Sequence, residues 1–455
     1  MYSILNTCKS HSKKLRANWL YYKAANQGKS LLLFNYLFWV LFYRRIVCYV
    51  IALPLVIIYF LLYPFIKFRF VKLIGSALGH YAVTTELLLS EMDALKNDKF
   101  KTLFYLEHSL YEQSICNEQL HAMWKRIIFI LPLQVSGIAH ALDKFLMILL
   151  KNTAYGMNGI KSRYENRWVR DPKSLLMNTP SHLTFTADEH RYAQEQLQKI
   201  NIQQHDKYIC LFVRSSAYNS HHPTWNYPER NVDIKTYMKA AHFLAEKGYY
   251  VLRMGKVVDD TIDSSHPRII DYARSEIRSD FMDIYLSACC YFFITTGSGL
   301  DGIPQIFKRP ILYTNCFILP HIASWYPHTL FTIKHLQSKK SGEFLPFADK
   351  INFFQSAEFI SRSGFHVSDY IQKHDLEFVD NTEDELVSVV KEMEAIMTNT
   401  WIDTPEHQQL QEKFWQIFST NIRLDDHHDK DRRLHGELYI KIGSSFLHKY
   451  QHLLS

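Results

Sequence analysis

The chain has 455 residues, of which 47% are hydrophobic and 21% charged, and this composition excludes a mainly disordered protein. Only 15 glycines and 14 prolines also exclude collagen-like and low-complexity designs. Because a single hydrophobic core rarely serves so long a chain, we expect at least two domains. The seven cysteines are odd in number and scattered, without a Cys-x-x-Cys pair. We therefore expect neither a disulfide framework nor a zinc site. The cysteine pattern fits a reducing compartment.

Positive charge is concentrated at the N-terminus. Eleven of the 52 Lys and Arg residues precede Glu86, the first acid. The rest of the chain contains 41 bases and 45 acids. A nucleic-acid-binding protein spreads its basic side chains over a folded domain, so we expect no nucleic-acid partner. Bases that flank the most apolar segment of a chain indicate a membrane instead.

That apolar segment, residues 46–66, contains 21 uncharged residues, close to the roughly 20 that cross a bilayer as a helix. It lies between Arg44–Arg45 and Lys67, so positive charge on both flanks leaves its orientation open. A single span, a re-entrant anchor with both ends in the cytoplasm, and a buried core helix all fit this pattern. The shorter apolar run 30–43 favours a separate interfacial helix. We expect residues 1–69 to form a basic N-terminus and membrane anchor.

After residue 69, short apolar strands alternate with amphipathic helices, which predicts α/β domains with parallel sheets. Two Rossmann-like, doubly wound domains that face a cleft are expected at 70–200 and 201–375, followed by C-terminal helices in 376–455. In the first domain, strands are predicted at 70–74 and 102–106, with helices at 82–95 and 117–126. In the second, six strands are predicted at 207–213, 249–253, 268–271, 291–295, 310–313 and 330–333. Further helices are predicted at 233–246, 279–289, 300–307, 383–397 and about 405–420, and residues 186–189 predict a helix start with Thr186 as its cap.

Polar side chains follow the predicted strands of the second domain, at the edge where open parallel sheets bind ligands. They are Arg214, Arg253, Asp271, Thr296, Ser298, Gly299 and Asn315, with Arg230 just before the helix at 233–246. Arginine forks match phosphate oxygens, and a glycine-containing turn before a helix lets backbone N–H groups approach an anion. The combination predicts a nucleotide-diphosphate site. The alternatives are an ordinary tight turn at 296–299 and structural ion pairs of the arginines.

His80 follows a glycine-containing loop at the carboxyl end of the first strand. A histidine there can face the interdomain cleft as a general base, although a purely structural role remains the alternative. No Gly-x-Gly-x-x-Gly, Walker, Gly-x-Ser-x-Gly or His-Glu-x-x-His motif occurs. The polar clusters 221–222, 259–260 and 425–429 are interpreted as solvated surface, so neither a metal nor a cofactor is expected.

Five segments in order resemble a family of bacterial glycosyltransferases associated with surface-polysaccharide and lipopolysaccharide gene clusters. They are residues 230–233, 248–255, 270–273, 279–286 and 295–299, and shorter matches occur at 74–80 and 117–126. The resemblance covers about residues 70–375 and implies the two-domain GT-B type. It also implies a nucleotide-sugar donor held mainly by the second domain, an acceptor that faces the first, and catalysis without a metal. It does not imply which sugar, base, acceptor or stereochemistry is involved.

We therefore expect an inner-membrane glycosyltransferase with cytoplasmic catalytic domains and a lipid-linked or glycan acceptor. Arg214 and Arg230, with the amides near Ser298 and Gly299, would stabilise the departing diphosphate, and His80 would deprotonate the acceptor hydroxyl. Two other functions fit the same residues. One is a nucleotide-sugar 2-epimerase on the same fold, and the other is a non-catalytic, membrane-bound glycan-assembly scaffold.

Overall fold

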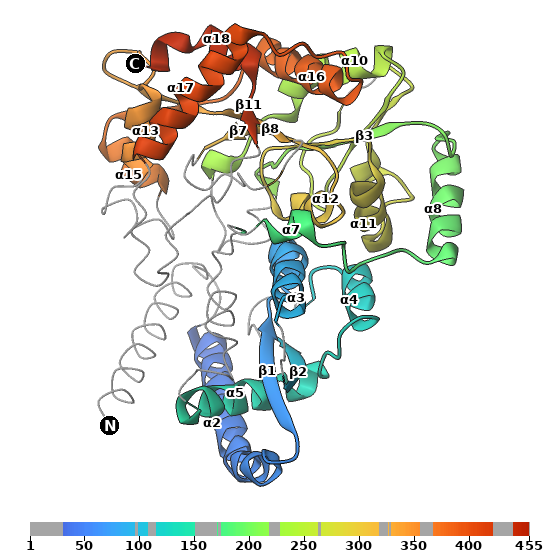
Figure 1. Cartoon of the computed structure of the whole chain (residues 1–455), viewed down its shortest axis with the longest axis vertical. Coiled ribbons are helices and arrows are strands. Elements are labelled where there is room, and N and C mark those ends of the chain that lie inside the picture. Colours follow the sequence, from blue (N-terminus) through green and yellow to red (C-terminus); the bar gives the residue numbers. More distant parts are fainter. Residues whose placement is uncertain are drawn as a thin grey trace.

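The computed structural model describes residues 31–95, 99–107, 115–150, 171, 174–217, 228–262, 265–317, 326, 329–354, 367–421 and 440–454. The clusters at 221–222 and 425–429 and the six bases that precede residue 31 lie outside these residues. The part from β3 onward occupies the upper region of Figure 1, and α2 with the first strands lies below it.

The main sheet has seven parallel strands in the order β11-β8-β7-β6-β3-β4-β5. Its strands are β3 (Tyr208–Phe212), β4 (Tyr250–Arg253), β5 (Ile269–Ile270), β6 (Phe293–Thr295), β7 (Ile311–Cys316), β8 (Thr329–Ile333) and β11 (Lys441–Ile442). The parallel sheet of the second half is confirmed, with one strand more than the six predicted. The extra strand, β11, comes from the C-terminal segment, where only helices were expected.

Helices cover both faces of this sheet, which explains why its strands are apolar on both sides. Ile209 and Leu211 of β3 pack with α10 (Met238–Glu246) and α16 (Glu383–Met397). The alternate residue Cys210 packs on the other face, with α11 (Asp280–Cys289), α12 (Gly302–Ile306), α17 (Pro405–Asn421) and α18 (Ser444–Lys449). Short 3-10 helices connect these elements at Pro228–Arg230 (η5), Ile234–Tyr237 (η6), Tyr272–Arg274 (η7), Gly299–Asp301 (η8) and Gln451–Leu454 (η10).

A smaller antiparallel pair flanks the main sheet. Strand β9 (His335–Ser338) pairs with β10 (Leu376–Val379), and α13 (Phe347–Phe354) and α15 (Val367–Lys373) lie next to them in sequence. Residues after 375 thus contribute two strands, β10 and β11, as well as helices. They complete the sheet domain because α16 lies against the strands and β11 extends the sheet.

The first half contains a two-stranded parallel sheet of β1 (Lys67–Leu73) and β2 (Phe100–Leu106), extended by a bridge between Phe104 and Ile130. A π-helix (η1, His80–Thr84) follows β1 and continues into α3 (Thr85–Asp93). The other helices are α4 (Glu118–Lys125), η2 (Leu133–Val135), α5 (Ser136–Leu149), α7 (Leu175–Asn178) and α8 (Ala187–Lys199). Helix α8 begins with the predicted capping threonine, Thr186, whose Oγ1 accepts from the backbone N–H of Glu189 at 3.2 Å.

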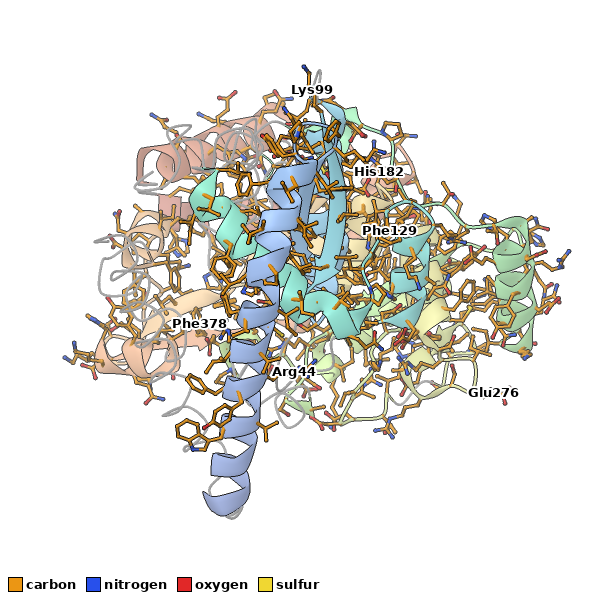
Figure 2. The ribbon with its side chains drawn as sticks, turned by 90° about the horizontal axis from the view of Figure 1, so that it is seen from below. Arg44, Lys99, Phe129, His182, Glu276 and Phe378 are labelled. Carbon is orange, nitrogen blue, oxygen red and sulfur yellow. The ribbon has the colours of Figure 1, made fainter. Side chains whose placement is uncertain are left out.

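Helix α2 (Leu31–Leu62) is one continuous helix that joins the two apolar runs we expected to be separate. Its segment Phe42–Leu62, with a mean hydropathy of 2.5, is long and apolar enough to cross a membrane by length and composition alone. Seen from below, α2 lies across the end of the molecule with α5 beside it (Figure 2).

Candidate functional site

The strand order of the main sheet reverses between β3 and β6. From β3 the chain builds outward through β4 to β5, and from β6 it builds in the opposite direction through β7 to β8. Ligands of open α/β sheets bind outside the carboxyl ends of the strands at such a reversal. Arg214 follows β3 and Thr296 follows β6, and the backbone N–H of Arg214 donates to Oγ1 of Thr296 at 3.1 Å. Two of the predicted site residues therefore meet at the reversal point.

Arg230 is brought to the same point by the loop that contains η5. The N–H of Val232 donates to the carbonyl of Arg214 at 3.0 Å, which fixes the loop beside β3. The guanidinium of Arg230 then donates through Nη2 to the carbonyl of Gly297, at 2.5 Å. Arg214 and Arg230, from segments either side of a gap in the described chain, thus converge on the turn after β6.

Lys334 adds a cation that the sequence reasoning missed. It follows β8, its side chain is buried, and Nζ donates to the carbonyl of Asn231 at 3.1 Å. The same ammonium pairs with Asp380 at 2.6 Å, while burial lowers its pKa. Asn231, the residue next to Arg230, is therefore hydrogen-bonded to the residue that follows β8. Lys334 directly follows the strand predicted at 330–333, so the rule that selected Arg214 would have found it.

Asp301 is a second residue that was missed, and its carboxyl group lies within the turn. Its Oδ2 accepts from the backbone N–H of Ser298 at 2.8 Å. Burial raises the pKa of Asp301 to about 7, opposed by this bond and by the charge of Arg230. The spacing of Ser298 and Asp301 is that of a capping box, which was the available sequence signal. Asp301 therefore changes charge close to neutral pH, beside an arginine of the site.

The amides of the turn at 296–299 are largely used inside the protein. The N–H of Thr296 donates to Phe212 O at 3.3 Å, that of Gly297 to Thr295 Oγ1 at 3.0 Å, and that of Ser298 to Asp301. The two helices that follow, η8 and α12, have three and five residues. The positive groups that could meet a diphosphate here are consequently the arginine side chains more than these amides.

Gly299 makes a close contact between the two halves of the chain. A Cβ atom added to Gly299 would lie 3.0 Å from the backbone N of Gly79, and one added to Gly302 would lie 3.1 Å from the Cα of Gly79. This contact brings the loop after β1 against the turn after β6. The predicted base, His80, is the next residue, half-buried, with Nδ1 3.4 Å from Thr84 Oγ1. The loop that precedes His80 thus lies against this turn, while the role of His80 stays a prediction.

Three other predicted residues are engaged within the protein. Arg253 is buried and pairs with Asp271 at 2.8 Å, and its Nη2 donates to Asp260 O at 2.7 Å. This is the ion pair that we gave as the alternative. Asn315 has a positive φ of 55° and exchanges two hydrogen bonds with Asn381, at 2.7 and 3.1 Å. Its Nδ2 donates to the hydroxyl of Tyr237 at 3.0 Å. Their binding of a donor stays a prediction.

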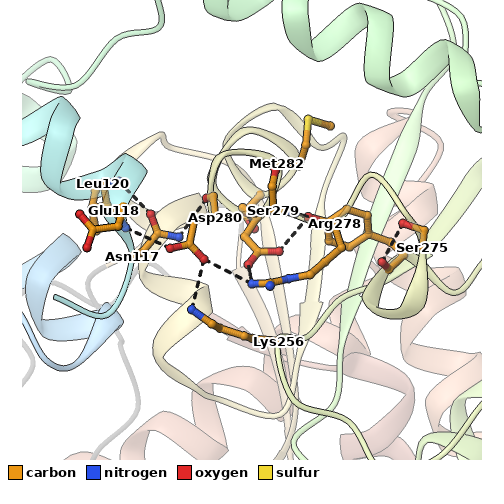
Figure 3. Close-up of polar contacts among 12 residues, drawn as sticks. Asn117, Glu118, Leu120, Lys256, Ser275, Arg278, Ser279, Asp280 and Met282 are labelled. Carbon is orange, nitrogen blue, oxygen red and sulfur yellow. Dashed lines mark hydrogen bonds and ion pairs between the residues drawn. The ribbon is translucent and has the colours of Figure 1, made fainter. Parts of the chain in front are cut away.

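A second polar contact joins the halves where the N-termini of α4 and α11 face each other (Figure 3). The Asp280 carboxylate accepts from the N–H of Glu118 at 3.1 Å, and Asn117 Nδ2 donates to the carbonyl of Asp280 at 2.9 Å. Lys256 and Arg278 contact the same carboxylate at 3.2 and 3.4 Å. An aspartate at two helix N-termini is stabilised by both dipoles, so this cluster fixes the first half against the sheet domain.

No group of three His, Cys, Asp or Glu side chains that could hold a metal ion is found within the described ranges.

No family model and no curated protein matches the chain. Among solved structures, the chain is similar to a glycosyl transferase family 9 protein from Veillonella parvula DSM 2008, with 13% identity, 73% of this chain and 98% of that chain covered, and a TM-score of 0.40. It is also similar to the E. coli ADP-heptose lps heptosyltransferase II, with 12% identity, coverage of 58% and 90%, and a TM-score of 0.32.

Proposed function

We propose that the chain is a glycosyltransferase that moves a sugar from a nucleotide-diphosphate donor to a lipid-linked or surface-glycan acceptor. The observation that carries this proposal is the convergence of Arg214 and Arg230 at the reversal point of the sheet. The loop that leads to His80 lies against the same turn, so groups for the leaving diphosphate and for the acceptor are available together. The resemblance of the five segments between residues 230 and 299 supports the choice of sugar transfer.

In the proposed reaction, the bond between the anomeric carbon and the diphosphate oxygen breaks, and the acceptor oxygen bonds to that carbon. Negative charge grows on the departing diphosphate, and Arg214 and Arg230 stabilise it electrostatically. The bond from Arg230 to Gly297 orients a guanidinium that has five N–H donors in all. His80 takes the proton of the acceptor hydroxyl. Asp301, with a pKa of about 7, is partly neutral at neutral pH and then opposes the anionic donor less than an ordinary aspartate would.

The proposed location is the inner membrane, with the catalytic part in the cytoplasm. Lipid-linked acceptors are held in a membrane, and the apolar helix α2 would keep the enzyme beside them. The free cysteines found among the described residues agree with a reducing compartment.

The test is a thermal-shift panel of UDP-, GDP-, CMP-, ADP- and dTDP-sugars with the full chain. A donor at about 100 times its Kd should stabilise the protein by about 2.7 kcal/mol. Arg230→Ala should abolish most of that shift, whereas Arg191→Ala, which changes an exposed arginine of α8, should leave it unchanged. A panel without any shift would contradict the proposal and favour the scaffold. Donor conversion without an acceptor would favour the epimerase.

A further inference from the structure

Helix α2 has two different faces. Along one face, residues three or four positions apart pack into a buried apolar cluster with the first half of the protein: Cys48, Tyr49, Ala52, Leu55, Val56, Tyr59 and Tyr63. The opposite face consists of exposed apolar side chains: Ile46, Val47, Val50, Ile51, Leu53, Ile57, Ile58, Phe60, Leu61 and Leu62. Exposed apolar area on this scale marks a site of interaction with a membrane or another protein.

The buried face of α2 is covered by the first half of the protein between Cys48 and Tyr63. After the helix the chain turns back, because the N–H groups of Phe65 and Ile66 both donate to Leu62 O. Strand β1 then lies beside the helix, where the hydroxyl of Tyr59 donates to the carbonyl of Phe68 at 2.9 Å. Helix α5 also crosses α2 closely, since a Cβ on Gly137 would lie 2.8 Å from the sulfur of Cys48. The helix is therefore an integral part of the folded first half.

This packing argues against α2 crossing a bilayer. Its neighbours β1, β2 and α5 would then lie at the depth of the hydrocarbon, together with the fully buried carboxylate of Asp143 and the buried guanidinium of Arg69. Asp143 accepts from the hydroxyl of Tyr105 at 2.8 Å, and Arg69 donates to Thr102 at 2.7 Å. Charged groups at this depth are costly, and the edges of a small open sheet would leave backbone groups unpaired in lipid. The two-stranded sheet of β1 and β2, which packs against α2, therefore lies outside the hydrocarbon.

The apolar surface also extends beyond α2. Phe65, in the turn after the helix, is 83% exposed, and Ile148 and Leu149 at the end of α5 are 56% and 54% exposed. Exposed bases lie toward opposite ends of this face: Arg44 and Arg45 within α2, and Lys99 and Lys101 at the start of β2. Arg44 and Lys99 are labelled in Figure 2, on either side of the apolar stretch. Lipid headgroups at both ends would neutralise these bases, whereas a second copy packed on this face would bring bases together.

We propose that α2 and the end of α5 bind one leaflet of an anionic membrane side-on, with the axis of α2 in the plane of the bilayer. The exposed apolar face lies at the level of the upper acyl chains, the bases meet anionic headgroups, and both ends of α2 stay on the same side. This arrangement rests on the membrane association proposed above, and it places the sheet domain next to the membrane surface without any segment of α2 crossing it.

The first experiment determines on which side of the membrane each end of the chain lies, without any substitution in the protein. Epitope tags are added at the N- and C-termini, and sealed inverted membrane vesicles are treated with protease before and after detergent. Side-on binding predicts that both tags are digested without detergent. Protection of the N-terminal tag with digestion of the C-terminal tag would show a span and overturn the proposal. This readout needs no enzymatic activity, so it is independent of the proposed reaction.

The second experiment asks whether α5 belongs to the membrane surface. Flotation of purified protein with phosphatidylglycerol–phosphatidylcholine vesicles is compared for the unmodified chain, for I148D with L149D, and for I402D. Ile402 is 78% exposed and lies in the segment between α16 and α17, which makes it a matched control. The α5 pair should weaken binding at least tenfold, and I402D should not. Unweakened binding of the α5 pair, or a lipid-free dimer in which this face is covered, would overturn the proposal.

Retention of the donor-induced melting shift in the α5 variant would show that the sheet domain is intact. If that variant does not fold, the tag experiment still decides, because it uses no substitution in the protein.

Discussion

Replacing Asp301 with asparagine should make the stability of the protein less dependent on pH. The buried carboxyl has a pKa of about 7 against an ordinary 3.8, so the folded protein holds its proton more tightly than the unfolded chain does. Below about pH 4 both states are protonated and no cost arises. As pH rises from about 4 to 7, the unfolded chain loses the proton first, and the folded state becomes relatively less stable. At about 1.4 kcal/mol per pKa unit, the full cost above pH 7 is roughly 4 kcal/mol.

Asparagine keeps an oxygen that can accept from the N–H of Ser298 and has no charge to bury. The free energy of unfolding of D301N should therefore equal that of the unmodified protein near pH 4 and exceed it by up to about 4 kcal/mol at pH 8. Urea denaturation followed by circular dichroism at both pH values measures this difference. D188N, at the exposed start of α8, is the control and should show no such change. A D301N difference of the same size at both pH values would refute the reasoning, because then the carboxyl would not titrate in this range.

Three further changes test the site. R230A should remove about 2–4 kcal/mol of transition-state stabilisation, seen as a lower turnover number, and leave the melting temperature unchanged. R230K should restore only part of the turnover, because lysine lacks the planar fork. Single-turnover kinetics measures both effects, and a fully active R230A would contradict the prediction. G299V places a Cβ 3.0 Å from Gly79 N, so overpacking should cost about 1–3 kcal/mol of stability and reduce donor affinity in parallel, as calorimetry of the free and donor-bound protein would show. R253M leaves Asp271 without its partner, and the loss of a buried pair should cost about 3–5 kcal/mol in denaturation while the donor affinity of the remaining folded protein changes little. A large loss of affinity without loss of stability would instead return Arg253 to the donor site.

Elements with a strong local pattern could be predicted from the sequence. Helix α16 has the predicted bounds, Glu383–Met397, because its Thr382 cap and acidic first turn mark its start. Strand β3 lies within its predicted range because a run of apolar residues between polar ones indicates a buried strand. Strand β11 has only two residues and pairs with β8 from more than a hundred positions away. No local pattern can signal a pairing of that kind, so the seventh strand was missed.

Helix α2 shows how a charge pattern was misinterpreted. Arg44 and Arg45 separate two apolar runs, and we interpreted them as a boundary between two helices. Arginine is a good helix former, however, and the sequence around it contains no glycine or proline to end the helix. Pro54, which does lie inside the helix, is on its exposed face. The helix therefore continues through the arginines, and its tertiary neighbours determine which of its faces is covered.

The sequence locates the candidate site only to the edge of the sheet at which the predicted strands end. Every predicted strand of a parallel sheet ends at the same edge, so Arg214, Arg253 and Asn315 were equal candidates. Strand order distinguishes them, because only β3 and β6 flank the reversal, and this order depends on pairings between distant segments. Arg253 ends β4, one strand away from the reversal, and its guanidinium is committed to Asp271 and Asp260. Arg214 lies at the reversal itself, and its carbonyl accepts from the N–H of Val232 in the loop that carries Arg230, so the strand order favours these two arginines over Arg253.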